Sequence, residues 1–156
     1  MMRHLLLVPA LLFTSPALAQ HASEEDSAAV LATVDALFET LGTRDPEAML
    51  AVTVPEGRAT GQMNARDGTS RMRGMSWSRF AEQLPGFPEG AGERLLDPHV
   101  HVDGDIAMIW SDYVFTQNER VVHCGTNHID LIRTDGTWKV NNLTWTQRTQ
   151  GCPAAE

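Results

Sequence analysis

Apolar and polar residues alternate through the last third of the chain, from residue 93 to residue 148. The alternation is interrupted by turn signals at Asp103-Gly104, Asn118-Glu119 and Asp135-Gly136. Asp-Gly between extended segments is a strong hairpin signal, because a type I′ turn needs a positive φ at both central residues. The pattern therefore predicts four long antiparallel strands joined by tight turns.

The chain before this region begins with helical spacing. Ser23, followed by three acidic residues, is typical of a helix N-terminus, because negative charge complements the helix dipole there. Gly42 predicts the end of the helix. The apolar residues between them fall on one helical face: Val30, Val34, Leu37, Phe38 and Leu41.

Shorter elements follow. Asp45-Pro46 predicts a second short helix that ends before Pro55. Segments 58–65 and 69–75 are predicted to be two strands about Asp67-Gly68, and Ser76 or Ser78 caps a third short helix that runs through Leu84. Helices followed by an antiparallel sheet predict an α+β fold.

The first nineteen residues have the pattern of a signal peptide. A short apolar run follows Arg3, and Ala17-Leu18-Ala19 forms a small-x-small cleavage site. The alternative, a membrane anchor, needs about 20 apolar residues, which this run does not supply. We therefore expect residues 1–19 to be cleaved and residues 20–156 to form a single domain, secreted or periplasmic and not bound to a membrane.

The net charge of the chain limits the classes of partner that it can bind. Twenty acidic residues stand against twelve Lys and Arg, which gives a net charge of −8, and Lys139 is the single lysine. This excess of negative charge argues against nucleic acid or an anionic membrane as a partner.

Two segments carry a family resemblance. The run Gly104-Asp105-Ile106-Ala107-Met108-Ile109-Trp110, with Tyr113 and Phe115, resembles the central strand of the nuclear-transport-factor-2-like superfamily, and residues 123–148 resemble its closing hairpin around Trp138. The resemblance covers about residues 24–148. It implies N-terminal helices packed in a strongly curved antiparallel sheet, a cone with a pocket inside. The superfamily includes ketosteroid isomerases, SnoaL-like cyclases, dehydratases, transport adaptors and many secreted members without known activity.

The cysteines predict a disulfide. Cys124 and Cys152 both survive signal cleavage, and an even count in an exported chain favours pairing over two free thiols. With a two-residue turn at residues 135–136, Cys124 lies opposite Gln147. The tail must therefore bend back to bring Cys152 to it, which Gly151 would permit.

Strand register predicts which side chains line the cone. Two-residue turns at all three hairpins place one set of polar and aromatic side chains on the face that also carries Ile129, Leu131, Trp138 and Val140. An apolar lining with a few convergent polar groups is typical of a small-molecule site. The expected pocket residues are Trp110, Asp112, His123, Asn127, Asn142 and Thr144.

The roles of the candidate residues follow from their chemistry and from the resemblance. The resemblance implies a carboxylate or His inside the cone as general base, as in enzymes of the superfamily. Asp112, His123 and Asp97 are the candidate catalytic groups; the alternative for Asp112 is an exposed residue or an ion pair with Arg148. Candidate ligand-binding residues are Trp110, Asn127, Asn142, Thr144 and His99. No cofactor is expected.

His99 and His101 share one strand face, and three interpretations stay open: a solvated surface, the rim of the pocket, or a metal site. No metal site is predicted, because no third ligand is assured. Taken alone, the strand has Pro98, Val100 and Val102 as its buried side. A one-residue slip at either earlier hairpin would exchange the two faces.

The opposite sheet face is apolar in this register, which predicts a homodimer across it. Its members are Ile109, Tyr113, Phe115, Val122, Ile132, Leu143 and Trp145. Three functions are compatible with these features. The first is binding of a small, partly apolar molecule; the second is an isomerase, cyclase or dehydratase; the third is a structural or protein-interaction domain.

Overall fold

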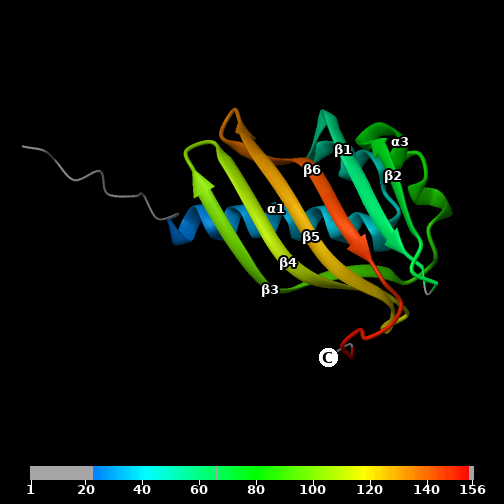
Figure 1. Ribbon diagram of the computed structural model, residues 1–156. Helices are drawn as coiled ribbons and strands as arrows, with labels where there is room; N and C mark the ends of the chain where they lie inside the picture. Colours follow the sequence, from blue (N-terminus) through cyan, green and yellow to red (C-terminus); the bar gives the residue numbers. More distant parts are fainter. Residues whose placement is uncertain (1–22, 66, 155–156) are drawn as a thin grey trace, which may run out of the picture.

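The structure, a computed structural model, describes residues 23–65 and 67–154. The predicted signal peptide lies outside these residues. The described chain forms a sheet covered on one side by helices (Figure 1). The strands are β1 (Thr53–Asn64), β2 (Ser70–Ser76), β3 (Ala91–Asp103), β4 (Ile106–Gln117), β5 (Arg120–Thr134) and β6 (Thr137–Gln147).

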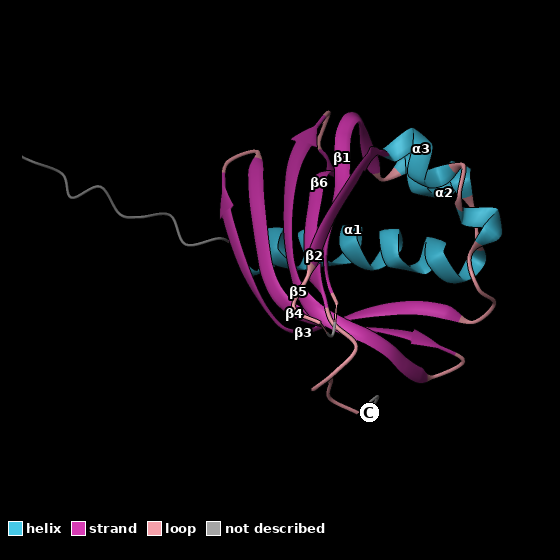
Figure 2. Cartoon of the chain, turned by 45° about the vertical axis from the view of Figure 1, so that its right-hand side comes forward, coloured by secondary structure: helices cyan, strands magenta, loops and turns pink. Residues whose placement is uncertain are grey.

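The sheet has six strands in the order β2-β1-β6-β5-β4-β3. Most neighbours are antiparallel, but β1 runs parallel to β6. The predicted α+β fold with a curved sheet around helices is confirmed, and the sheet is mixed rather than wholly antiparallel. Figure 2 shows it bending around the longest helix, with the far ends of β3, β4 and β5 curving beneath that helix.

That helix, α1 (Glu24–Thr43), begins where the sequence predicts. Ser23 is its N-cap and accepts a hydrogen bond from the Asp26 N–H at 3.0 Å. The predicted apolar face is buried. The helix continues past Gly42 and ends at Thr43, and its C-cap residue Arg44 has a left-handed conformation with φ 57°. A Cβ at Gly42 would lie 3.0 Å from the Ala91 carbonyl oxygen, so glycine serves a close helix–strand contact there.

Three short helical segments close one end of the core. They are α2 (Pro46–Ala51), α3 (Trp77–Ala81) and the 3-10 turn η1 (Leu84–Gly86). Asp45 caps α2 as predicted, and Ser76 caps α3. Met49, Trp77 and Leu84 are fully buried beneath them. Among the helices of the described residues, none has the length and hydropathy needed to cross a bilayer.

Three shifts of strand register decide which side chains face the helices. The turns at 118–119 and 135–136 have the predicted two-residue length, with Gln117 opposite Arg120 and Thr134 opposite Thr137. The first hairpin turns at Gly104 and Asp105, one residue later than predicted. The register then moves by one residue between Phe115 and Thr116, between Asp130 and Leu131, and between Leu96 and His99. A bulge of this kind moves every following side chain to the other face.

The bulges give the sheet an apolar concave face and a polar convex face. The predicted apolar patch of Ile129, Leu131, Trp138 and Val140 is buried on the concave face. It continues into residues that the predicted register had placed outside: Ile109, Tyr113, Phe115, Leu143 and the partly buried Trp145. On the convex face, Ile106 is 60% exposed and Trp110 is 55% exposed.

The predicted disulfide between Cys124 and Cys152 is confirmed. Cys124 pairs with Arg148 through two backbone hydrogen bonds, one residue beyond the predicted partner. The tail then turns at Gly151, which has φ 65°, and the two Cα atoms lie 5.6 Å apart. Cys124 and its strand neighbour Val114 are each 1% exposed, and neither belongs to the main core cluster.

Candidate functional site

A small cavity lies inside the cone, where α1, α2 and α3 face the sheet. Its volume is about 40 Å³. A water molecule needs roughly 10–15 Å³ on this measure, so the cavity has room for about three waters or a small organic molecule. Its lining is apolar except at one point: Leu37, Phe38, Leu41, Met49, Phe80, Leu143, Trp145 and Glu93.

Glu93, near the start of β3, is the polar exception. Its Oε1 accepts a hydrogen bond of 2.7 Å from Nδ2 of Asn127 on β5. Among the described residues, no cationic side chain forms an ion pair with it. Burial among apolar walls raises the pKa of Glu93 to about 7, and the bond from Asn127 opposes this only in part. The carboxyl is therefore poised to change its charge near neutral pH.

Asn127 is completely buried, and one of its polar atoms is unsatisfied. The side chain is 0% exposed, and its Oδ1 has no hydrogen-bond partner among the described residues. Buried polar atoms are nearly always hydrogen-bonded, so each exception needs an explanation. Here the unsatisfied atom belongs to the same side-chain amide that donates a hydrogen bond to Glu93.

A cluster of rings lies beside this pair. Tyr113 Oη donates to the Thr146 carbonyl oxygen at 3.0 Å, and His123 Nδ1 lies 3.3 Å from the same Oη. Because a tyrosine hydroxyl has one proton, this arrangement assigns the proton of the second contact to His123 Nδ1. His123 also stacks on Phe115 at 4.6 Å between ring centroids.

Burial shifts both titratable rings away from their usual pKa values. It lowers the pKa of His123 to about 4, so the imidazole is neutral at physiological pH. Burial also raises the pKa of Tyr113, with the Glu93 charge adding to the effect and Arg148 opposing it. Neither ring therefore carries a charge beside Glu93 near neutral pH.

A shallow groove on the surface of the molecule is also lined by Glu93. It has a volume of about 360 Å³ and runs between the second half of α1 and the start of β3. Glu93 lines both this groove and the inner cavity. Its other lining residues are Asp35, Phe38, Glu39, Gly42, Thr43, Ala91 and Gly92. Glu93 thus stands between the cavity and solvent, beside two further acidic residues.

The prediction that six residues point into one cavity is wrong. His123 and Asn127 lie on the concave side, but Trp110, Asp112, Asn142 and Thr144 lie on the convex side. The extra residue at Val122 reverses β4 relative to β5, and the extra residue at Asn141 reverses the end of β6. Trp110 therefore pairs with His128, and Asp112 pairs with Thr126.

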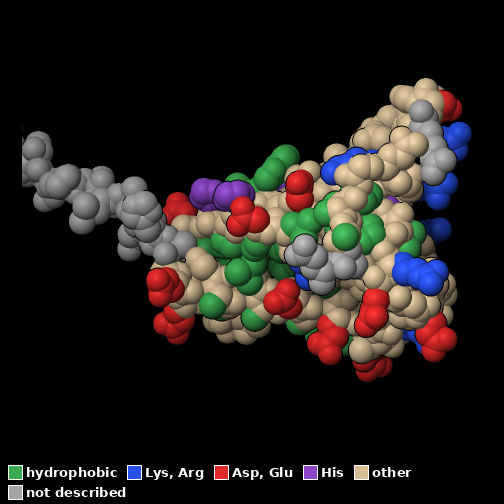
Figure 3. All heavy atoms as spheres, turned by 90° about the horizontal axis from the view of Figure 1, so that it is seen from below, with side chains coloured by type: hydrophobic (Ala, Val, Ile, Leu, Met, Phe, Trp, Pro, Cys, Tyr) green, Lys and Arg blue, Asp and Glu red, His purple; other side chains and the backbone are tan. Residues whose placement is uncertain are grey.

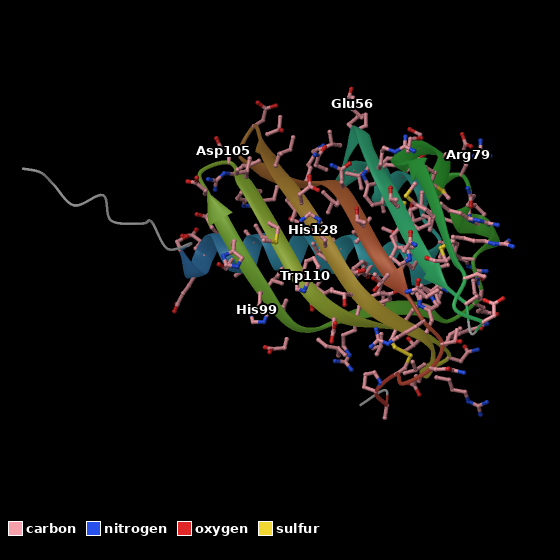
Figure 4. The ribbon with its side chains drawn as sticks, viewed as in Figure 1. Glu56, Arg79, His99, Asp105, Trp110 and His128 are labelled. Carbon is pink, nitrogen blue, oxygen red and sulfur yellow. A yellow bond between two sulfur atoms is a disulfide. The ribbon has the colours of Figure 1, made fainter. Side chains whose placement is uncertain are left out.

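The convex residues interact with each other instead of with the cone. Asp112 accepts a hydrogen bond from Thr126 Oγ1 at 2.8 Å, and Asn142 donates to Asp130 at 3.1 Å. His99 lies opposite Trp110, and Figure 4 shows His99, Trp110 and His128 on the side of the sheet away from α1. Figure 3 shows histidine side chains gathered at one edge of the molecule. Of the three interpretations of His99 and His101, the structure supports the solvated surface.

Asp97 has a local structural role. It has φ 52° and sits at the register shift in β3, where two residues face one residue of β4. A positive φ in a non-glycine residue is tolerated best by Asp and Asn. Among the described residues, no three His, Cys, Asp or Glu side chains lie close enough to hold a metal ion.

Glu93 is the candidate site residue that the sequence analysis missed. It lies at the start of the predicted sheet region, next to a loop rich in Pro and Gly. The sequence contained one clue to this position. Glu93 and Leu95 are two residues apart on one strand, so their side chains point to the same face of the sheet. Leu95 packs against the core, and Glu93 is drawn inward with it.

Comparisons with known proteins bear on the fold. No protein-family model matches the sequence, and no curated protein matches it. A protein of unknown function from Nostoc punctiforme with a cystatin-like fold superposes with a TM-score of 0.67 and 13% identity, over 84% of this chain and 97% of its own. A nuclear-transport-factor-2-like protein of unknown function from Shewanella baltica superposes with a TM-score of 0.61 and 12% identity, over 80% and 94%. The chain has the nuclear-transport-factor-2-like fold.

A further similar structure carries a functional name. It is a Novosphingobium aromaticivorans protein, provisionally named as the β subunit of an aromatic-ring-hydroxylating dioxygenase, with a TM-score of 0.64 and 16% identity. It covers 83% of this chain and 94% of its own. Identities this low show the nuclear-transport-factor-2-like fold alone, and one fold supports many functions.

The surface assigned to the predicted homodimer is wrong. Ile109, Tyr113 and Leu143 are at most 6% exposed and belong to the core cluster beneath the helices. They cannot meet a second subunit, because the register shifts turn them inward. The homodimer itself stays a prediction, without that surface. The structural or protein-interaction domain also stays a prediction, and it likewise loses that surface.

Proposed function

We propose that this protein is exported and binds a small, partly apolar molecule inside its cone. The observation that carries this proposal is the apolar cavity with one carboxylate, Glu93, in its wall. Apolar walls with a small number of placed polar groups are typical of ligand sites. The groove beside Glu93 supplies a route to the surface.

The polar pair in the core supports binding over a purely structural role. Desolvating a carboxyl group and leaving an amide oxygen unpaired are both unfavourable, by about 1–3 kcal/mol for the oxygen alone. Apolar residues of similar size at Glu93 and Asn127 would avoid this cost. A ligand that binds the carboxylate of Glu93, which Asn127 holds in the cavity wall, gives a reason to retain the pair.

Export is supported by the disulfide. Disulfides persist in oxidising compartments and are rare in the cytoplasm. The Cys124–Cys152 bridge therefore agrees with the signal sequence predicted over residues 1–19. Sequencing the N-terminus of the protein from its natural host checks this part: we expect Gln20 as the first residue. A first residue at Met1 would contradict it.

Native mass spectrometry of the protein from its natural host tests the binding proposal. We expect an additional mass on the wild-type chain that is lost in Leu41→Trp, because the larger ring fills the cavity. Trp110→Ala, on the convex face, is the matched control and should retain the additional mass. Equal occupancy in both variants would place the ligand elsewhere.

A second candidate function is acid–base catalysis at the same site. One observation favours it: the pKa of Glu93 is raised to about 7, where a carboxylate accepts and releases protons efficiently. Glu93 then takes the role that the sequence analysis assigned to Asp112. For an enzyme, Glu93→Gln should abolish turnover of the bound molecule while leaving its mass attached. Unchanged turnover in that variant would eliminate this candidate.

A further inference from the structure

We propose that the ligand of the cone is a small alkylammonium ion, held by the carboxylate of Glu93 against the aromatic side chains of the cavity. This inference rests on the proposed binding function, because it names the chemical class of ligand for the same cavity. Three observations support it: the hydrogen-bonding groups, the aromatic lining and the charge at the opening.

The hydrogen-bonding groups at the polar end require a donor. Asn127 Nδ2 supplies one donor, and Glu93 Oε1 accepts it at 2.7 Å. At the cavity wall, Glu93 Oε2 accepts no hydrogen bond from a described residue and stays free to bind a donor. Asn127 Oδ1, which is buried behind the wall, also has no partner among the described residues. An ammonium group carries several N–H donors and no acceptor, so it complements this end of the cavity. A carboxylate ligand would bring only further hydrogen-bond acceptors, with no donor for Glu93.

The aromatic lining favours a positive charge. Phe38, Phe80 and Trp145 all contribute to the cavity wall. The face of an aromatic ring attracts a cation within about 6 Å, and the attraction is stronger where water is excluded. The remaining aliphatic walls, which include Leu37 and Leu143, suit the alkyl part of the ligand.

The charge of the outer groove also favours a positively charged ligand. Asp35, Glu39 and Glu93 line the outer groove, and its other residues are uncharged. A groove of one sign concentrates small ions of the opposite sign and raises their rate of association. The carboxylate of Glu93 also has no cationic partner among the described side chains, so an arriving cation would compensate a charge that the protein leaves uncompensated.

The size of the cavity limits the ligand. About 40 Å³ suits a molecule of few heavy atoms rather than a ring system. Isobutylammonium is an appropriate probe. Isobutanol keeps its alkyl group without the charge, and isobutyrate reverses the charge.

The test is a titration of the full mature chain with each probe at pH 8, followed by NMR at the indole N–H of Trp145. We expect isobutylammonium to bind at least tenfold more tightly than isobutanol, and isobutyrate not to bind. In Glu93→Gln, the preference for isobutylammonium over isobutanol should disappear. Asp112→Asn removes a carboxylate from the convex face and should leave the preference unchanged.

Each result has a distinct meaning. Tighter binding of isobutanol or isobutyrate by the wild-type chain would overturn the ammonium assignment and leave the binding function intact. No response to any probe would overturn both. The ranking of the three probes on the wild-type chain decides the question even if Glu93→Gln does not fold.

Discussion

Asn127 donates a hydrogen bond of 2.7 Å to Glu93, although the two residues are 34 positions apart in the sequence and lie on strands that do not pair with each other. The bond crosses β4, above the bend of the sheet. It fixes the only carboxylate that lines the inner cavity among the described residues, and it leaves the amide oxygen of Asn127 unsatisfied.

Gly125, on the same strand as Asn127, permits a close approach of β5 and β6. A Cβ at this position would collide with the Thr146 carbonyl and approach the Tyr113 ring. Glycine therefore lets the backbones of β5 and β6 come together at this point. We expect Gly125→Ala to lower the midpoint of urea unfolding. Gly136→Ala is less suitable as a control because Gly136 has φ 75°, so Gly86→Ala, with open space around the added methyl, is the control.

The stability of the fold should depend on pH through Glu93 and His123, whose effects have opposite signs. The pKa of Glu93 is raised to about 7, so the folded state holds an extra proton between about pH 4.5 and 7 and loses stability as pH rises. The pKa of His123 is lowered to about 4, so the unfolded state holds the extra proton between about pH 4 and 6.5 and stability rises with pH. The two contributions oppose each other over about pH 4.5–6.5.

Single variants should separate these contributions. Relative to wild type, Glu93→Gln should show stability rising with pH over this window, and His123→Gln should show it falling. The slope is at most about 1.4 kcal/mol per pH unit for each group, and smaller for His123 because it is partly exposed. Urea unfolding at several pH values measures the slope, and the slope of the double variant, which lacks both groups, should lie between those of the two single variants. Parallel profiles for all four proteins would contradict the assignment.

Two isoleucines on β4 test the register. Ile109 is 0% exposed on the concave face, and Ile106 is 60% exposed on the convex face. Ile109→Ala should lower the free energy of unfolding by about 2–5 kcal/mol, and Ile106→Ala by less than about 0.5 kcal/mol. Denaturant unfolding of both variants gives the comparison. A larger loss in Ile106→Ala would restore the register predicted from two-residue turns alone.

The disulfide should make a large contribution to stability. It joins residues 28 positions apart, and the chain-entropy description gives about 3–4 kcal/mol for such a loop. The double variant Cys124→Ala/Cys152→Ala should lose this amount, and a reducing agent should then have no further effect on it. Intact mass after alkylation without reductant should show no modified thiol in the wild-type chain.

Arg133 should hold the start of α1 to the sheet. Its guanidinium contacts Asp26 at 2.6 Å and Asp105 at 2.8 Å, and it lies 4.8 Å from the centre of the Trp138 ring. We expect Arg133→Gln to lower global stability only slightly, since exposed ion pairs are screened by solvent. Amide hydrogen exchange should accelerate in the first turn of α1 and stay unchanged in α3.

Some of the fold could be predicted locally. Ser23 and Asp45 cap helices where their sequence context indicates, and the turns at residues 118–119 and 135–136 have the expected length. These features depend on interactions within a few residues, such as a capping hydrogen bond or the backbone preference of Asp-Gly. The disulfide was also predictable, because two cysteines offer a single pairing.

The faces of the strands were decided by the tertiary structure. Side-chain alternation has a period of two, so one extra residue at Val122 moved Trp110 and Asp112 outside and brought Ile109 and Tyr113 inside. No local signal marks this residue. Its position is set by the bend of the sheet around α1, which depends on contacts between residues far apart in the sequence.

Local patterns in the sequence were enough to predict the elements, their order, the turns at residues 118–119 and 135–136, the cysteine pair and the α+β class. Each of these depends on local conformational preference or on composition. Long-range packing set the concave face, the burial of the Glu93 carboxyl and its contact with Asn127. Burial is a property of the packed chain, and it is burial that raises the pKa of this carboxyl to about 7.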